Sequence, residues 1–101
     1  MDRRLELQKL LESILESRNV YFQPPSNTKL SYPCIVYSRS DVDSKYADNF
    51  KYNYRVRYSL ILIGRSPESE FVEKLLMLPY CSYDRAYVAD TLNHDAFTLY
   101  Y

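Results

Sequence analysis

The amino-acid sequence predicts an α+β fold: a mostly antiparallel, mixed sheet with an N-terminal helix and a second helix packed against it, ending in a C-terminal β-hairpin. Three observations predict this fold. Residues 52–64 alternate with the period of a strand, residues 7–15 repeat apolar side chains with the period of a helix, and shorter strand-like segments stand on both sides. At 101 residues the chain has the length of one ordinary domain, so we expect residues 1–101 to fold as a single unit.

The long strand predicted over residues 52–64 is the centre of this arrangement. Alternate positions form one continuous apolar and aromatic face, made of Tyr52, Tyr54, Val56, Tyr58, Leu60 and Leu62. The opposite face begins polar and basic and ends with Ile61 and Ile63. We therefore expect the first half of the strand to keep one wet face, and the second half to be covered on both faces by this chain or by another subunit.

A first helix is predicted over residues 2–18. Its apolar stripe follows the i, i+3, i+4, i+7 spacing and consists of Leu7, Leu10, Leu11, Ile14 and Leu15. Asp2 at the start and Arg18 at the end suit the helix dipole, and Asn19 is a suitable end point. Such a stripe indicates a helix packed on a sheet.

Two strands and two loops follow the first helix. Residues 20–23 form a short strand that Pro24 and Pro25 end, because proline cannot donate to a ladder. Residues 34–40 form the next strand. The polar and acidic residues 41–50 are interpreted as a long loop before the central strand, and a loop of that length usually carries a function.

A second helix is predicted from Ser66 as N-cap, with Pro67 at the first helical position and Pro79 beyond the end. Its apolar stripe is Phe71, Val72, Leu75, Leu76 and Leu78. This helix is expected to cover the sheet near Ile61 and Ile63, or the opposite face.

Residues 81–101 are predicted to form a hairpin whose turn lies at residues 91–93. The chain ends inside a strand, at Tyr100 and Tyr101. An exposed aromatic strand edge favours aggregation unless something covers it, so this ending points to an obligate assembly.

Composition narrows the function classes. Apolar residues are 47% and charged residues 26%, which excludes a disordered chain. The single glycine excludes glycine-rich phosphate loops, and the net charge of zero disfavours a protein whose main task is gripping nucleic acid. No apolar run approaches the ~20 residues of a membrane helix, and the N-terminus lacks the features of a signal peptide. The 12 tyrosines suit half-buried sheet surfaces and partner contacts.

Catalytic, cofactor and metal sites find little support. His94 and Asp95 are adjacent on a strand and are expected to point to opposite faces, which argues against a catalytic pair. Cys34 lacks flanking residues typical of a nucleophile, and with Cys81 it is expected to be a buried free thiol. Residues 41–48 fail the calcium-loop pattern. We therefore expect no catalytic, cofactor-binding or metal-ligating residues and no enzymatic activity.

A basic run interleaved with tyrosine, formed by Lys51, Arg55 and Arg57, leaves three interpretations. It could bind single-stranded nucleic acid, but the tyrosines fall on the opposite face from Arg55 and Arg57. It could instead contact the acids of a neighbouring subunit, or simply be a solvated face. Among these the subunit contact is preferred to nucleic-acid binding.

Three segments carry a resemblance to a known family: YPCIVYSRSDVDSKYADN, YNYRVRYSLILIGRSPESE and LPYCSYDRAYVADTLNHDAFTLYY. With them the chain resembles the tail terminator, or tail-completion, proteins of long-tailed, siphovirus-like bacteriophages. The resemblance implies a hexameric ring that caps the head-proximal end of the tail tube, stops tube growth and joins the tube to the head connector. It implies a structural virion protein, assembled in the host cytoplasm and located in the neck.

The resemblance implies partners as well. They are further copies of this chain, the tail tube protein and the head-completion or connector proteins, while genome DNA passes through the ring without specific binding and no membrane is involved. Hypothetical interface residues are Asp41, Asp43, Tyr46, Asp48, Arg55, Arg57, Tyr100 and Tyr101. The alternatives are a head-completion or stopper protein of the same neck and, from another class, a small intracellular enzyme or binding domain.

Overall fold

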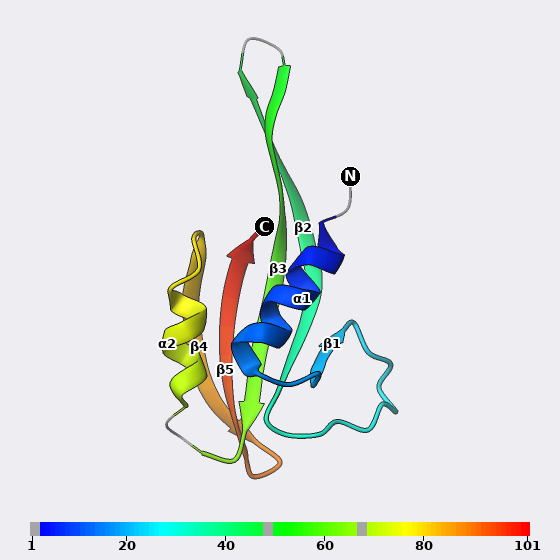
Figure 1. The fold of residues 1–101 in the computed structure, drawn as a ribbon, viewed down its shortest axis with the longest axis vertical. Helices are drawn as coiled ribbons and strands as arrows, with labels where there is room; N and C mark the ends of the chain where they lie inside the picture. The colour runs from blue at the N-terminus through cyan, green and yellow to red at the C-terminus, as the bar shows by residue number, and fades with distance from the viewer. Residues whose placement is uncertain (1–2, 48–49, 67–68) are drawn as a thin grey trace.

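A computed structural model describes the backbone of residues 3–47, 50–66 and 69–101, and the side chains of these residues except 41–47 and 50–55. In chain order the elements are α1 (Arg4–Leu15), β1 (Val20–Phe22), β2 (Cys34–Ala47), β3 (Phe50–Gly64), α2 (Glu70–Leu76), β4 (Cys81–Ala89) and β5 (Leu92–Tyr100). Figure 1 shows α1 and α2 side by side in front of a twisted sheet.

The sheet has five strands in the order β1-β2-β3-β5-β4. The short β1 pairs parallel to β2, and every other pairing is antiparallel. The predicted fold class is therefore confirmed: an α+β fold with a mixed, mostly antiparallel sheet, two helices against it and a C-terminal hairpin.

The core lies between the helices and one face of the sheet. Its fully buried residues come from both helices and from β2, β3 and β5, and include Leu7, Leu11, Leu75, Ile35, Tyr37, Tyr58, Leu60, Phe97 and Leu99. The apolar face predicted for the central strand thus points into the core at Tyr58, Leu60 and Leu62. Burying each large side chain contributes roughly 1.5–3 kcal/mol, so this layer dominates the stability of the fold.

A polar link inside this core ties α1 to the sheet. The hydroxyl of Tyr37 donates to Oε1 of Gln8 at 2.6 Å, and Nε2 of Gln8 donates to the carbonyl of Val20 at 2.9 Å. The rings of Tyr37 and Tyr58 meet edge to face with centroids 5.8 Å apart. Part of the tyrosine excess is therefore used inside this chain's own core rather than at a partner surface.

Both helices are shorter than the sequence predicted. Helix α1 ends at Leu15, because Glu16 adopts a left-handed conformation with φ 57°. Helix α2 begins at Glu70 with Ser69 as N-cap, so the predicted cap at Ser66 is wrong, and Pro67 lies outside the described residues. The Ser69 hydroxyl accepts from the backbone N–H of Phe71 at 3.2 Å.

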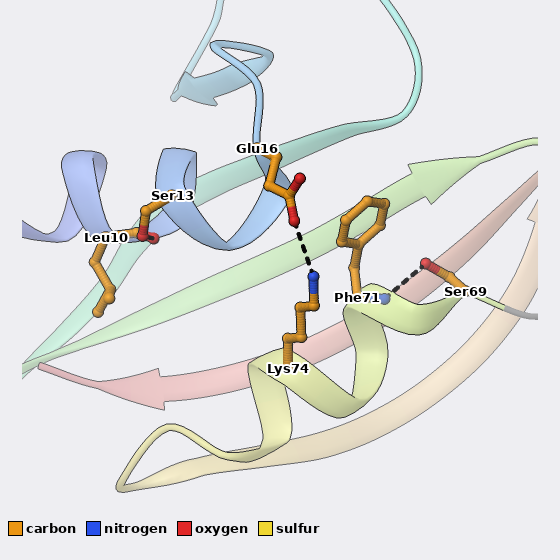
Figure 2. A network of polar contacts seen from close by, with 6 residues as sticks. All are labelled: Leu10, Ser13, Glu16, Ser69, Phe71 and Lys74. Atoms are coloured by element: carbon orange, nitrogen blue, oxygen red, sulfur yellow. Dashed lines mark hydrogen bonds and ion pairs between the residues drawn. The ribbon is translucent and has the colours of Figure 1, made fainter.

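The apolar stripe of α2 also needs a correction. Leu75 is fully buried, and Phe71, Val72 and Leu78 pack against the core, but Leu76 is 43% exposed. Since successive helical residues are rotated by about 100°, a residue next to Leu75 points away from the core. Figure 2 shows an ion pair between the end of α1 and α2, in which Nζ of Lys74 lies 3.1 Å from Oε2 of Glu16.

The predicted loop over residues 41–50 is wrong. Strand β2 continues to Ala47 and β3 already begins at Phe50, so the two strands form one long hairpin. The mainly polar composition of the segment hides its strand character, because Val42, Tyr46, Ala47 and Phe50 do not form a continuous apolar alternation. Register shifts between Arg39 and Asp41 and between Lys45 and Tyr46 show irregularities in the ladder.

The C-terminal hairpin turns one residue earlier than predicted. Asp90 and Thr91 both have positive φ, 52° and 61°, and Ala89 pairs with Leu92 across them. Two central residues with positive φ define the tight turn that matches strand twist, and Asp is among the residues that tolerate it. Leu92 is therefore a paired strand residue rather than part of the turn.

The expectation that the C-terminus forms a strand edge is also wrong. Strand β5 pairs with β3 on one side and β4 on the other, and the edge strand on that side of the sheet is β4. The N–H groups of Tyr100 and Tyr101 donate to the carbonyls of Tyr80 and Val56 at 3.1 and 3.0 Å. Strand order is set by tertiary contacts that a linear pattern does not contain.

Candidate functional site

The hairpin of β2 and β3 projects beyond the rest of the fold. We call the ribbon formed by residues 41–47 and 50–56 the arm. The pairing of β3 with β5 ends at Arg57 and Tyr100, while the pairing of β3 with β2 continues to Ala47 and Phe50. Figure 1 shows this two-stranded ribbon extending past the ends of the other elements, and it accounts for the 50 Å length of a fold that is 26 × 22 Å across.

The arm brings predicted interface residues together in cross-strand register. Asp41 is paired with Arg57, and Asp43 is paired with Arg55. Directly opposite residues of opposite charge stabilise a two-stranded ribbon by roughly 0.2–1 kcal/mol per pair. The backbone register thus offers the two arginines acidic partners within their own chain, where the sequence had suggested the acids of a neighbouring subunit.

At the base of the arm, side chains join the ribbon to the body. Nε of Arg57 donates to Oγ of Ser40 at 3.3 Å, and the same hydroxyl donates to the Arg57 carbonyl at 2.9 Å. The guanidinium of Arg3 lies 4.3 Å from the centre of the Tyr101 ring. The backbone N–H of Tyr101 in turn donates to the Val56 carbonyl, so Tyr101 is attached to β3 at the base of the arm.

The predicted residues divide between the arm and its base. Tyr46 pairs with Lys51 towards the far end of the arm, and Tyr100 pairs with Arg57 at the base. Asp48 lies outside the described residues, and the side chains of Asp41, Asp43, Tyr46 and Arg55 lie outside the described part as well. Sequence reasoning missed Arg3 and Ser40, because only the folded chain brings α1 and β2 beside Tyr101 and Arg57.

The geometry of the arm is suited to contact rather than to chemistry. A two-stranded hairpin is marginally stable alone in water. The outer edges of the arm have no strand partner among the described residues, so their backbone groups can pair with another chain. The arm can therefore act as a projection that gains stability when a neighbour covers it.

His94 and Asp95, which are adjacent in the sequence, have separate partners in the structure. The ring of His94 stacks on Tyr87 with centroids 4.8 Å apart, whereas Asp95 accepts from the Tyr83 hydroxyl at 2.8 Å. Cys34 and Cys81 are free. Burial raises the pKa of the Cys34 thiol to about 11, and burial with the nearby Asp84 raises the pKa of the Cys81 thiol to about 11. Both thiols therefore stay protonated near neutral pH, whereas a cysteine nucleophile reacts as the thiolate.

Searches for metal and membrane features were confined to the described residues. In that part of the chain, no group of three or more His, Cys, Asp or Glu is arranged to hold a metal ion. The same residues contain no helix that is long and apolar enough to cross a membrane.

Comparison with known proteins finds no matching family model, no matching curated protein and no matching solved structure.

Proposed function

We propose that this chain is a structural protein of a bacteriophage neck, a tail terminator whose copies close into a ring on the head-proximal end of the tail tube. The resemblance of its sequence to tail terminators supplies the setting. The observation that carries the proposal is the arm, a two-stranded ribbon that extends beyond the core and whose outer edges have no strand partner in the described chain.

The arm supports an assembly role through its energetics. A monomeric protein gains little from a marginal hairpin that projects into water. In a ring, each arm can lie on the next copy, and contacts of this head-to-tail kind close when the rotation between copies divides a full turn. Six copies are proposed from the resemblance, with one face of the ring on the tube and the other on the head connector.

A terminator ring acts by binding and blocking. Once seated, it covers the surface to which another tube subunit would add, so the tube stops growing at that end. Its second face then offers the head connector a docking surface. This role needs no catalytic group, and a net charge of zero is compatible with DNA sliding through the ring without being held.

The test is electron microscopy of lysates from a phage that lacks this gene. Filled heads beside unjoined tails of abnormal length are expected, and a plasmid copy of the intact gene should restore whole particles. Filled heads and abnormal tails that persist despite the plasmid copy would show a second lesion rather than this protein's role.

Two other outcomes would overturn the proposal. Empty heads beside free tails of normal length would place the protein on the head side of the neck, as a head-completion or stopper protein. Intact infectious particles would remove both neck roles and return the chain to the class of small intracellular binding domains.

A further inference from the structure

Strand β4 lies at one edge of the sheet, away from the arm, and offers its backbone to another strand. It pairs with β5 on one side, and its other side has no strand partner in the described part of the chain. Helix α2 lies in front of β4 in Figure 1, but the side chains of residues 82–86 are exposed. An edge strand that is open in this way is a template for pairing with a further strand.

The pairing with β5 shows which backbone groups of β4 point outward. The N–H of Tyr100 donates to the carbonyl of Tyr80, so the even-numbered residues of β5 point their backbone groups toward β4. Their partners in β4 are even-numbered before the register shift between Tyr83 and Arg85, and odd-numbered after it. The N–H and C=O groups that point outward from the sheet therefore belong to the remaining positions, which are Cys81, Tyr83, Ala86 and Val88.

This outward set is symmetric about the midpoint between Asp84 and Arg85. When a second copy of β4 runs antiparallel beside the first, with Asp84 opposite Arg85, Tyr83 lies opposite Ala86. The outward groups near the two ends of the strand meet in the same way. A bulge at an edge ordinarily hinders pairing, because it changes the spacing of the outward groups. A second copy carries the same bulge at the matching place, so the spacing of the two strands agrees.

The same register brings opposite charges together. Oδ2 of Asp84 accepts from the Thr98 hydroxyl at 2.7 Å, and the guanidinium of Arg85 lies 5.0 Å from the centre of the Tyr87 ring. Tyr87 stacks on His94, which shares one face of β5 with Thr98, so the acid and the base lie on the same face of the sheet. In the symmetric register each Asp84 faces the Arg85 of the other copy, an arrangement that stabilises paired strands.

The register shift decides this charge pattern. With a regular β4, the outward groups would be symmetric about Asp84 itself, and the fully paired register would place two acids opposite each other. Like charges directly opposite destabilise paired strands. The bulge moves the centre of symmetry by half a residue and exchanges this repulsion for two attractive pairs.

We propose that two copies of this chain pair through their β4 edges, antiparallel and around a two-fold axis that passes between Asp84 and Arg85. The two five-stranded sheets then form one continuous sheet. The contact is self-complementary, because the same surface is used on both copies. It goes beyond the proposed function, since it uses β4 and leaves the arm free for the contact within a ring.

The first test follows amide hydrogen exchange in the full-length protein across a concentration series, with the molar mass measured by light scattering. As pairs form, exchange of the outward amides of Tyr83 and Ala86 should slow by about tenfold or more, because each gains a hydrogen bond. The inward amides of Ser82 and Tyr87 should change little. Outward amides whose exchange is the same at every concentration would overturn the inference.

A proline tests the backbone pairing directly. Ala86→Pro removes an outward donor that β5 does not use, so it should weaken the association by about tenfold or more while the pairing within the chain remains. Ala86→Ser keeps the donor and is the matched control. Thermal unfolding of both variants checks that the body stays folded. Wild-type association of a folded Ala86→Pro protein would contradict the proposed pair.

A charge exchange between copies tests the two-fold register without altering the backbone. Asp84→Lys and Arg85→Glu each place like charges at both contacts of a pair, so each variant alone should associate several-fold more weakly. An equimolar mixture of the two variants should associate as the wild type does, because the new lysine of one copy faces the new glutamate of the other. A mixture that associates no better than either variant alone would exclude this register.

The outcomes also separate this pair from the neck role. A protein that assembles while its outward β4 amides stay unprotected would overturn the β4 pair and leave the proposed function in place. A protein whose β4 amides become protected, but which is dispensable for infection, would keep the pair and lose the proposed function.

Discussion

The body and the arm of this protein obtain their stability in different ways. In the body, buried side chains from α1, α2 and the strands form one apolar cluster. The arm continues two of the same strands past the last residue that β5 pairs, with acids and bases opposite each other in register. Buried apolar side chains stabilise the body without any partner, whereas a two-stranded ribbon gains stability when another chain packs against it.

The comparison teaches where mutations should act. Changes in the body should alter the free energy of unfolding, and changes in the arm or on the surface should alter it little.

Phe97→Ala should destabilise the body most. Phe97 is 1% exposed and meets Tyr83 edge to face with ring centroids 5.3 Å apart, so truncation leaves a cavity in the core. The free energy of unfolding should fall by ~3–5 kcal/mol. Urea unfolding measures it, with Val88→Ala, at a 68% exposed position on β4, as the control. Equal losses in the two variants would contradict the assigned core.

Tyr37→Phe should cost about 1–2 kcal/mol, because Gln8 Oε1 loses its donor inside the core. Tyr83→Phe is the matched control, since it removes a hydroxyl bond of similar length, to Asp95, at an exposed site. Its cost should stay below ~0.5 kcal/mol. Urea unfolding of both variants measures these losses. A smaller loss for Tyr37→Phe than for Tyr83→Phe would contradict the proposed hydrogen-bond link between α1 and β2.

Reversing the charges of Arg55, in the arm, and Arg57, at its base, should loosen the arm without unfolding the body. Arg55→Glu with Arg57→Glu places acids opposite Asp41 and Asp43, at roughly 0.2–1 kcal/mol per pair. Amide hydrogen exchange over residues 42–46 should therefore accelerate several-fold. Adding Asp41→Lys and Asp43→Lys restores opposite charges and should restore slow exchange. Unchanged exchange in the first variant would mean that the register pairs contribute nothing.

Lys74→Ala should have the smallest effect. The lysine and Glu16 are both partly exposed, at 41% and 71%, so water screens their attraction. A loss of ~0.2–1 kcal/mol is expected, diminishing as salt is added. Thermal unfolding at low and high salt measures it. A loss as large as that of Phe97→Ala would show that the helices depend on this ion pair rather than on the core.

Periodicity in the sequence predicts some of the features used here and does not predict others. The core face of β3 and the stripe of α1 followed from periodicity, because burial on one side imposes a regular spacing on apolar residues. The arm did not follow from it, since residues 41–47 lack the continuous apolar alternation that marks a buried face. Its signal was of another kind: Asp41 and Asp43 precede Arg55 and Arg57 at spacings that a tight hairpin brings opposite each other.

Other differences between the predicted and the observed structure have two causes. Strand order depends on tertiary contacts, and two serines compete to cap α2. Nothing in a linear pattern places β5 between β3 and β4, so the chain end looked like an edge. Ser66 and Ser69 can both cap a helix, and the structure uses Ser69. A cavity on the face of the sheet away from the helices is lined by residues from β2, β3, β4 and β5 and from the segment after β1, which only the folded sheet brings together. The predicted partner residues at the arm stay predictions.

Removing the arm while keeping the body tests whether the arm joins copies of this chain. Joining Val42 to Val56 through an Asn-Gly turn deletes residues 43–55 while leaving every core residue named above. We expect a free energy of unfolding within ~1 kcal/mol of wild type, together with loss of ring assembly by light scattering and failure to restore particles in the phage that lacks the gene. A shortened protein that assembles and restores infectivity like the intact chain would contradict it.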